Sequence, residues 1–244
     1  MSVKKIKKLL FILSKKKLLK ALFNGCAIGY EHYNFFKYIE YENINHIIDI
    51  GANNGQFSLM ARLFNCDARI DAFEPLPPPR KIYKKIFKND QNTFLHSYAI
   101  GDTTKNNINM NVSKRIDSSS ILNISKLQSD TFPNTEKSIN CKVDVVTLES
   151  FLQKNNIKIK NKSLLKIDVQ GYEYNCLIGI NKYLNSFKYI YCEASAYPFY
   201  TGQKLAGDVV DYLSSKGFTL IKIFNPVVSK ENDVLQADFL FKKK

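Results

Sequence analysis

Four carboxylates in this chain lie at the end of an apolar run. This is the position where a buried strand would end and a turn would begin. The four carboxylates are Asp49, Glu74, Asp168 and Glu193. Parallel strands end together at one edge of a sheet, and ligands of open α/β proteins bind at that edge. The sequence therefore predicts a binding crevice lined by carboxylates, which can accept hydrogen bonds or take up a proton.

The first carboxylate precedes a loop bounded by Gly51 and Gly55, and this spacing separates two kinds of cofactor. Dinucleotide-binding folds carry the pattern G-x-G-x-x-G, whose middle glycine lets the backbone approach a pyrophosphate. The loop here lacks that pattern, and Asp49 would repel a phosphate. Asp49 could instead accept hydrogen bonds from an ammonium group, and Glu74 from both hydroxyls of a ribose. S-adenosylmethionine has an ammonium group, a ribose and no phosphate, so these residues favour it as the cofactor.

Alternating strand and helix patterns indicate the elements that position these residues. Residues 46–57 form a β-branched strand, a glycine turn and the start of a helix, and residues 68–73 form the next strand. Further strands are expected at residues 93–100, 141–146, 163–169 and 187–192, with helices at 80–88, 148–154 and 205–216. The last two strands, residues 218–224 and 237–241, leave no room for a crossover helix and must be antiparallel. The predicted fold is α/β, with a mostly parallel seven-stranded sheet that ends in an antiparallel hairpin. This is the class I (Rossmann-like) methyltransferase arrangement.

Residues 103–135 are a long polar segment rich in Asn, Ser, Thr and Lys. We expect a short hairpin around residues 107–112, followed by a loop through Ser118, Ser119 and Ser120. Connections of this length are uncommon in compact domains unless they serve a function. Because the segment starts at the ligand edge, we expect it to cover the substrate or the cofactor.

The formal net charge of +14 is concentrated at the two ends of the chain. Residues 1–20 contain eight lysines and no acid, and residues 242–244 are three more lysines, which leaves +3 for the rest. A protein that binds nucleic acid needs a basic face on its folded domain. The sequence therefore argues against a nucleic-acid partner and against an RNA methyltransferase.

Residues 1–43 are predicted to form a basic helical extension ahead of a methyltransferase domain at residues 44–244. Two short amphipathic helices are expected, with their apolar faces at Ile6, Leu9, Leu10 and Leu13 and at Leu18, Leu19, Leu22 and Phe23. Residues 1–20 could lie on an anionic membrane surface, or the helices could pack on the domain or on a partner subunit of a homo-oligomer. The apolar runs are too short for a signal peptide or a membrane span. We expect a cytoplasmic protein, with peripheral contact to the inner face of the membrane left open.

The cysteines and histidines mostly indicate structure. The five cysteines have no zinc-ligand spacing and lie largely in apolar segments, so we expect reduced, buried thiols. His46 and His96 lie in or beside predicted strands, where a structural role is expected. His32 lies in a polar and aromatic stretch before the domain and is kept as a candidate site residue.

Five motifs, in order along the chain, resemble those of the FkbM family of S-adenosylmethionine-dependent O-methyltransferases. They are Ile48–Gly55, Phe73–Pro75, Ala99–Asp102, Ser118–Ser120 and Leu165–Glu173. The similarity covers about residues 44 to 242, and the last motif is the most specific because of its length. The resemblance implies methyl transfer to a hydroxyl, in bacteria often on sugars of surface polysaccharides (capsule or lipopolysaccharide) or on natural products.

The resemblance also implies which residues bind each part of the ligands. The methionine moiety is assigned to Asp49, Gly51, Ala52, Asn53 and Gly55, the ribose to Glu74, and the adenine to Ala99–Asp102, where Asp102 could accept from the amino group. Candidate residues for the acceptor, a small-molecule or nucleotide-linked sugar, are Ser118, Ser119, Tyr172 and Glu173. A helix-start charge is the alternative for Glu173.

An alcohol is a poor nucleophile while it keeps its proton, so a base is expected in the site. Asp168 is the first candidate and Glu193, one strand over, the second. The two could instead share a divalent metal such as Mg²⁺, or Asp168 could only shape the pocket. An NAD-dependent oxidoreductase, which the loop spacing disfavours, and a non-catalytic membrane-associated scaffold are the remaining alternatives.

Overall fold

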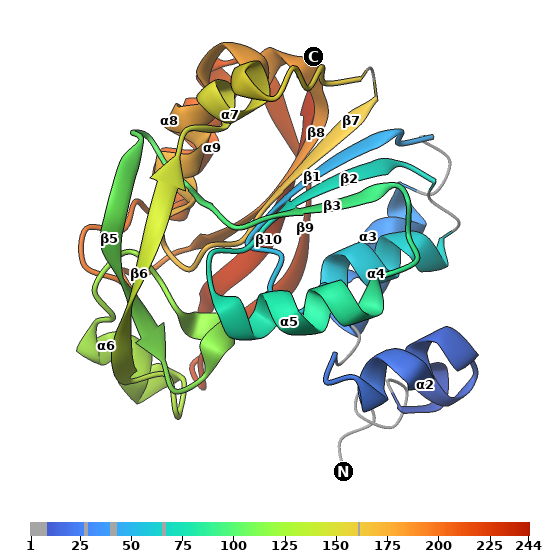
Figure 1. Ribbon diagram of the computed structural model, residues 1–244. Coiled ribbons are helices and arrows are strands. Elements are labelled where there is room, and N and C mark those ends of the chain that lie inside the picture. Colours follow the sequence, from blue (N-terminus) through green and yellow to red (C-terminus); the bar gives the residue numbers. More distant parts are fainter. Residues whose placement is uncertain (1–8, 27–28, 40–42, 65–66, 161) are drawn as a thin grey trace.

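The computed structural model describes residues 9–26, 29–39, 43–64, 67–160 and 162–244 of the chain. A seven-stranded sheet runs through its centre in the order β3-β2-β1-β7-β8-β10-β9 (Figure 1). Its strands are β1 His46–Ile50, β2 Arg69–Phe73, β3 Thr93–His96, β7 Ser163–Ile167, β8 Phe187–Ser195, β9 Phe218–Val228 and β10 Val234–Lys243. Neighbours from β3 to β8 are parallel, and β10 runs antiparallel to both β8 and β9. The class I methyltransferase fold predicted from the sequence is confirmed, closing hairpin included.

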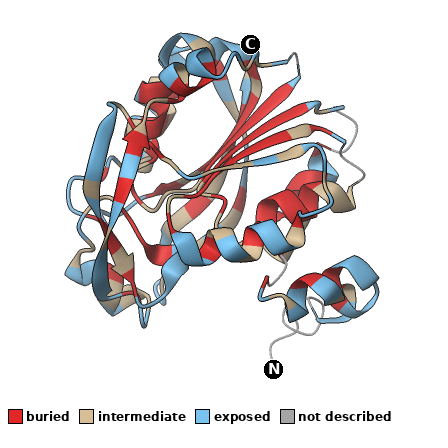
Figure 2. Cartoon of the chain, viewed as in Figure 1, coloured by how far each residue is buried: buried red, intermediate tan, exposed pale blue. Residues whose placement is uncertain are grey.

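The central strands β1 and β7 are covered on both faces, as their apolar sequences predict. Every residue of both strands is buried. Successive side chains of a strand point to opposite faces, so Ile47 and Leu164 join one hydrophobic cluster while Ile48 and Leu165 join another. The two clusters form the core on either side of the sheet (Figure 2).

Helices cover both faces of the sheet (Figure 1). The cluster on one face takes in side chains from α2 Lys16–Phe23, α3 Tyr33–Tyr38, α4 Gln56–Leu63 and α5 Pro77–Ile86. The cluster on the other face takes in α7 Leu148–Lys154, α8 Glu173–Ile180 and α9 Ala206–Ser215. The helix α7 has a side-chain cap at its start, because the Thr147 hydroxyl accepts a hydrogen bond from the Ser150 N–H at 3.1 Å.

A second sheet of three strands takes the place of much of the expected polar loop. Its order is β4-β6-β5, with β4 Ala99–Ile100, β5 Lys105–Ser113 and β6 Lys137–Val146. The hairpin expected at residues 107–112 is wrong, because these residues belong to β5, which pairs antiparallel with β6. The strand expected at residues 93–100 divides into β3 and β4, which belong to different sheets. After β5 the chain passes through the 3-10 helix η3 Ile116–Ser118 and the helix α6 Lys126–Thr131.

The described part of the N-terminal extension packs into the same core as the sheet. Leu18 and Ala21 of α2 are buried, and the ring of Phe35 in α3 stacks on Tyr191 of β8 with 4.0 Å between centroids. Residues 1–8, which carry Ile6 and four of the eight lysines, lie outside the described residues. Within the described part of the chain, no helix is long and apolar enough to cross a membrane.

The cysteines behave largely as expected. Cys26, Cys176 and Cys192 are buried thiols, and Cys141 is a partly buried thiol. Cys66 lies outside the described residues. Burial raises the pKa of the Cys176 and Cys192 thiols well above the ordinary value, which keeps them protonated and unreactive.

Candidate active site

A cavity of about 440 Å³ lies at the edge where the parallel strands end. Its size is in the range of small-molecule sites. Eleven residues singled out from the sequence as site candidates line it: His32, Gly51, Ala52, Asn53, Glu74, Ala99, Ser118, Ser119, Asp168, Tyr172 and Glu193. The predicted crevice is therefore present, and the polar segment after β5 forms part of its wall.

The turn after β1 needs glycine because two strand ends meet there. Gly51 has a φ of +81°, and a Cβ built on it would lie 1.9 Å from the carbonyl oxygen of Asp168. Gly55 also has a positive φ, +90°, but a Cβ there would lie 2.7 Å from the ring of Phe87. Gly55 thus lets α4 begin close to the end of α5. It does not line the cavity, which corrects the cofactor contact expected for it.

Glu74 presents a buried carboxylate with a fixed direction. One of its oxygens accepts a hydrogen bond from the Asn53 N–H at 3.0 Å, and the other accepts from the Leu76 N–H at 2.8 Å. Burial raises the pKa of Glu74 to about 7, although these two donors oppose the shift. Glu74 therefore changes its charge within the neutral pH range.

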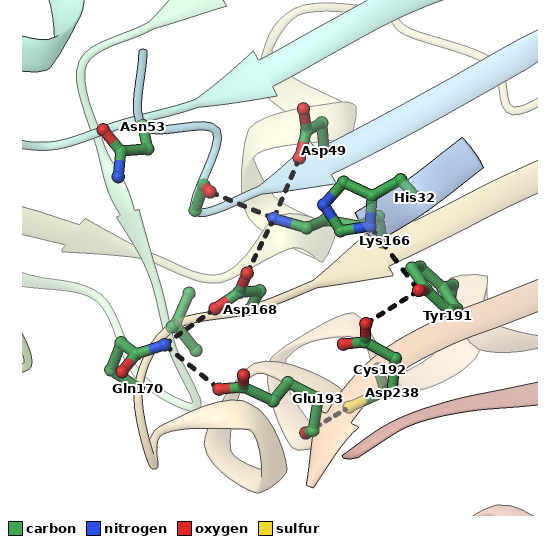
Figure 3. Close-up of polar contacts among 12 residues, drawn as sticks. His32, Asp49, Asn53, Lys166, Asp168, Gln170, Tyr191, Cys192, Glu193 and Asp238 are labelled. Carbon is green, nitrogen blue, oxygen red and sulfur yellow. Dashed lines mark hydrogen bonds and ion pairs between the residues drawn. The ribbon is translucent and has the colours of Figure 1, made fainter. Parts of the chain in front are cut away.

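Lys166 places a buried ammonium group among the strand ends. Its Nζ donates to the carbonyl oxygen of Gly51 at 3.1 Å, and it lies 3.4 Å from Asp49 Oδ1 and 3.5 Å from Asp168 Oδ2 (Figure 3). Burial disfavours the ammonium form, but the carboxylates of Asp168 and Asp49 outweigh it and raise the pKa of Lys166 above its ordinary value. Lys166 therefore stays charged and ties β1 to β7.

Asp49 lies beneath the cavity wall, with its side chain 0% exposed. It stands opposite Lys166 in the β1–β7 register, so both side chains point to the same face of the sheet. Its Oδ2 accepts from the Ser58 hydroxyl at 2.9 Å, and that hydroxyl accepts from Tyr83 at 3.0 Å. The expected contact of Asp49 with the ammonium group of the cofactor is thereby corrected, because the ammonium group that it faces is that of Lys166.

Asp168 and Glu193 are bridged by the side-chain amide of Gln170. The amide nitrogen donates to Asp168 Oδ1 at 2.9 Å and to Glu193 Oε2 at 3.0 Å (Figure 3). The hydroxyl of Tyr200 donates to the amide oxygen at 3.0 Å, which fixes the amide with its nitrogen toward the carboxylates. Burial and the neighbouring carboxylate of Asp168 raise the pKa of Glu193 well above its ordinary value. Glu193 therefore keeps a proton to higher pH than an exposed glutamate does.

The same geometry bears on the alternative in which Asp168 and Glu193 share a divalent metal ion. The donor nitrogen of Gln170 binds both carboxylates, whereas Mg²⁺ needs oxygen ligands around it. In the described ranges, no group of three or more His, Cys, Asp and Glu side chains is placed to hold a metal ion. The structure thus gives the Mg²⁺ alternative no support.

Two other carboxylates expected at the ligands lie behind the cavity wall. Asp102 accepts a hydrogen bond from the Tyr172 hydroxyl at 3.2 Å. Glu173 accepts from the N–H groups of Val169 at 2.9 Å and Gly171 at 3.1 Å, and burial raises its pKa to about 7. Neither side chain lines the cavity, so the structure gives no support to the contacts expected of Asp102 with adenine and of Glu173 with the acceptor. Each carboxylate instead holds a part of the chain that does line the cavity.

His32 reaches the cavity from the N-terminal extension, in the 3-10 helix η1 Tyr30–His32. Its Nδ1 lies 3.5 Å from the hydroxyl of Tyr191, which donates to Asp238 at 2.8 Å (Figure 3). His32 is 8% exposed. The candidate kept from the sequence therefore does lie at the site.

The other two histidines have the structural role that was expected. His46 and His96 each place Nε2 2.9 Å from a different carboxylate oxygen of Asp71, and Arg69 adds a contact of 2.6 Å. Burial alone would raise the pKa of Asp71, but these hydrogen bonds outweigh it and hold the pKa well below its usual range. The cluster links β1, β2 and β3 and does not line the cavity.

Lys166 and Gln170 were missed by the sequence analysis. A signal existed for Lys166, which interrupts the apolar run at residues 164–167. A charged residue in a strand buried on both faces needs an opposite charge beside it. Gln170 lies within the motif Leu165–Glu173, but its role as a bridge could not be inferred, because its partners Tyr200 and Glu193 are distant in sequence.

Solved structures with related folds include SMU.1697c from Streptococcus mutans in complex with SAH. It is 10% identical, with a TM-score of 0.48, and the match covers 86% of this chain and 97% of that one. Aeropyrum pernix fibrillarin with natively bound S-adenosyl-L-methionine is 13% identical, with a TM-score of 0.46, 92% of this chain covered and 74% of that one. At these identities the likeness concerns the fold alone.

Sequence comparison gives a more specific result. No curated protein matches the chain significantly. The profile of the family described as the methyltransferase FkbM domain matches residues 49–220, which is more than half of the chain. The matched range begins at Asp49 and includes the glycine turn, Glu74, the bridged pair Asp168 and Glu193, and Lys166. The chain therefore belongs to the FkbM methyltransferase domain family.

Proposed function

We propose that the chain is an S-adenosylmethionine-dependent O-methyltransferase whose acceptor is a hydroxyl of a sugar or nucleotide-sugar. Membership of a methyltransferase family supports the reaction. The observation that carries the proposal is a cavity that joins the glycine turn and Glu74 to the carboxylates Asp168 and Glu193. A direct group transfer needs donor and acceptor sites side by side, so that the reacting atoms are held in line.

The residues around the turn after β1 fit a nucleoside cofactor. Gly51 and Ala52 keep the wall thin there, so a ligand can approach the backbone closely. Glu74 is already oriented by two backbone donors and can accept from a ribose diol without reorganising. Ala99 and Ile100 supply an apolar wall suited to a base. When bound, S-adenosylmethionine supplies a methyl group activated by its positively charged sulfur.

Asp168 is the group best placed to take the proton of the acceptor hydroxyl. Lys166 lies 3.5 Å from one of its oxygens and Gln170 donates to the other at 2.9 Å, so the carboxylate is held before the acceptor arrives. An oriented base can remove the proton as the new bond to oxygen forms. Glu193, whose pKa is raised, stands across Gln170 and can hold a proton beside it.

The lining on the acceptor side supports a ligand rich in hydroxyl groups. Ser118, Ser119, Gln170 and Gln236 offer uncharged donors and acceptors. Arg115 lines the cavity too and could meet a phosphate of a nucleotide-sugar. A place in bacterial surface polysaccharide synthesis is part of the same proposal. The thiols support a reducing, cytoplasmic setting.

Calorimetric titration with S-adenosylmethionine and, separately, with NADH tests the cofactor. We expect saturable binding of S-adenosylmethionine and none of NADH. Binding of NADH alone would overturn the proposal in favour of an oxidoreductase. Binding of neither compound would also overturn it, because the chain would then have the fold of the family without its cofactor.

A further inference from the structure

We propose that the N-terminal helices bind the surface of an anionic lipid bilayer through exposed apolar side chains bordered by lysines. This inference is independent of the proposed methyl transfer. We call the exposed set the N-terminal apolar patch, which consists of Leu9, Leu10, Leu13, Leu22 and Phe23.

The patch concentrates apolar surface in a short part of the chain. Fifteen large apolar side chains are exposed among the described residues, and five of them belong to residues 9–23. Phe23 is 87% exposed and Leu10 61%. Single exposed apolar side chains are normal, whereas a concentration of them marks an interaction surface.

A packed scaffold displays the patch. Residues 9–13 and α2 are helical, and Ile12, Leu18 and Ala21 are buried in the core cluster that α3 and α4 share. In Figure 1, α2 lies at the periphery of the molecule, near the N-terminus. Because the buried side chains fix the inner face of the two helices, the patch is left on their outer side and needs no unfolding to meet a partner.

Lysines border the patch, and the sequence around them contains no acid. Lys16 and Lys20 share one face of α2 with Phe23, at positions i, i+4 and i+7. Lys15 and Lys17 are exposed beside them. Residues 1–30 contain no Asp or Glu. Lysines next to Leu and Phe on a short helix are typical of helices that lie in the membrane interface.

This charge distribution favours a bilayer over a second copy of the chain. Two copies of the patch would bring uncompensated lysines together, and like charges repel. The surface of an anionic bilayer is negative, and each lysine near it raises the affinity about fivefold. The transfer of the apolar side chains out of water then increases the affinity for the bilayer further.

The test is co-sedimentation of the full chain with vesicles of phosphatidylcholine that contain phosphatidylglycerol, and with vesicles of phosphatidylcholine alone. We expect binding to the anionic vesicles at low salt, and a strong decrease as salt shortens the screening length from about 10 Å at 0.1 M to about 3 Å at 1 M. Absence of binding to anionic vesicles at low salt would overturn the proposal.

Matched variants distinguish binding through the N-terminal apolar patch from binding through the general positive charge of the chain. Leu10→Gln should weaken vesicle binding about tenfold, whereas Ile139→Gln, 62% exposed on β6, should not. Lys16→Gln with Lys17→Gln should weaken binding about 25-fold, and Lys84→Gln with Lys85→Gln on α5 should leave it unchanged.

Equal effects of the paired variants would overturn the patch as the binding surface. A self-associated full chain that dissociates in Leu10→Gln and ignores vesicles would assign the patch to a second copy and also refute the proposal. All six substituted side chains are exposed in the structure, so thermal unfolding should stay unchanged in these variants.

Discussion

Because the pKa of Glu74 is raised, we expect cofactor binding to depend on pH in the neutral range. The ribose hydroxyls are donors, so they bind best to the ionised carboxylate. Burial raises the pKa of Glu74 to about 7, so the ionised form dominates above that pH and the protonated form below it. The affinity for S-adenosylmethionine should therefore rise about tenfold between pH 6 and pH 8, because the ionised fraction grows from about 0.1 to about 0.9.

Glu74→Gln should remove most of that dependence. A hydrogen bond to a charged group contributes about 1.5–3 kcal/mol and a neutral one about 0.5–1.5 kcal/mol. The difference of about 1–1.5 kcal/mol means that the variant should bind S-adenosylmethionine about 5- to 13-fold more weakly at pH 8, and nearly as well as the wild type at pH 6. Both carboxylate oxygens of Glu74 accept hydrogen bonds from backbone N–H groups. In the variant, the side-chain NH₂ group therefore faces one of these N–H groups, and two donors meet without an acceptor. Thermal unfolding should accompany the calorimetry for this reason.

Glu173→Gln is the matched control, since burial also raises the pKa of Glu173 to about 7 but its side chain does not line the cavity. Its Oε1 accepts from both backbone donors, and an amide oxygen can do the same. This variant should keep the pH dependence of the wild type. A wild-type affinity that is flat from pH 6 to pH 8, or a dependence lost in Glu173→Gln and kept in Glu74→Gln, would refute the assignment of the ribose to Glu74.

Three further variants test the rest of the site and the fold. Asp168→Asn should lower turnover about 100-fold or more while cofactor affinity stays close to wild type, as kinetics with labelled cofactor would show; unchanged turnover would remove Asp168 from the mechanism. Lys166→Met should lower the free energy of unfolding, measured in urea, by about 3–5 kcal/mol, because the buried carboxylates Asp49 and Asp168 lose their counter-charge. An unchanged free energy of unfolding would mean that the fold does not depend on this counter-charge. Asp71→Asn should cost about 3–5 kcal/mol at pH 7. Because the folded pKa of Asp71 is depressed, its contribution is present above the ordinary value of 3.8 and is lost as pH falls below it, so the deficit should shrink in acid; a deficit independent of pH would contradict the role of the charge.

The strands and the ligand edge could be predicted because their sequences carry strong local signals. β1 and β7 are apolar runs that meet glycine or carboxylates at their ends, and burial on both faces follows directly. β5 could not be predicted as a long strand. Most of its asparagines face solvent at a sheet edge, so its sequence resembles a loop. Its pairing with β6 depends on contacts about 30 residues away in sequence.

Within the site, the sequence predicted best the residues whose positions depend on the turns at the strand ends. Gly51 to Asn53 and Glu74 are held by local turn geometry, and they line the cavity as expected. The position of Asp49 at the end of an apolar run suggests a place at the cofactor, but that position does not determine the direction of its side chain. The strand register sets Asp49 against Lys166, and this pairing cannot be read from either segment alone.

The central claim is most directly tested by methyl transfer itself. The full chain would be incubated with S-adenosylmethionine labelled in its methyl group and a panel of nucleotide-sugars, and the products analysed by mass spectrometry. We expect label to enter a hydroxyl of a sugar in an amount equal to the S-adenosylhomocysteine formed, and Asp168→Asn to lose this transfer while still binding the cofactor. Label that enters RNA or an amine and no sugar hydroxyl, or transfer that is undiminished in Asp168→Asn, would contradict it.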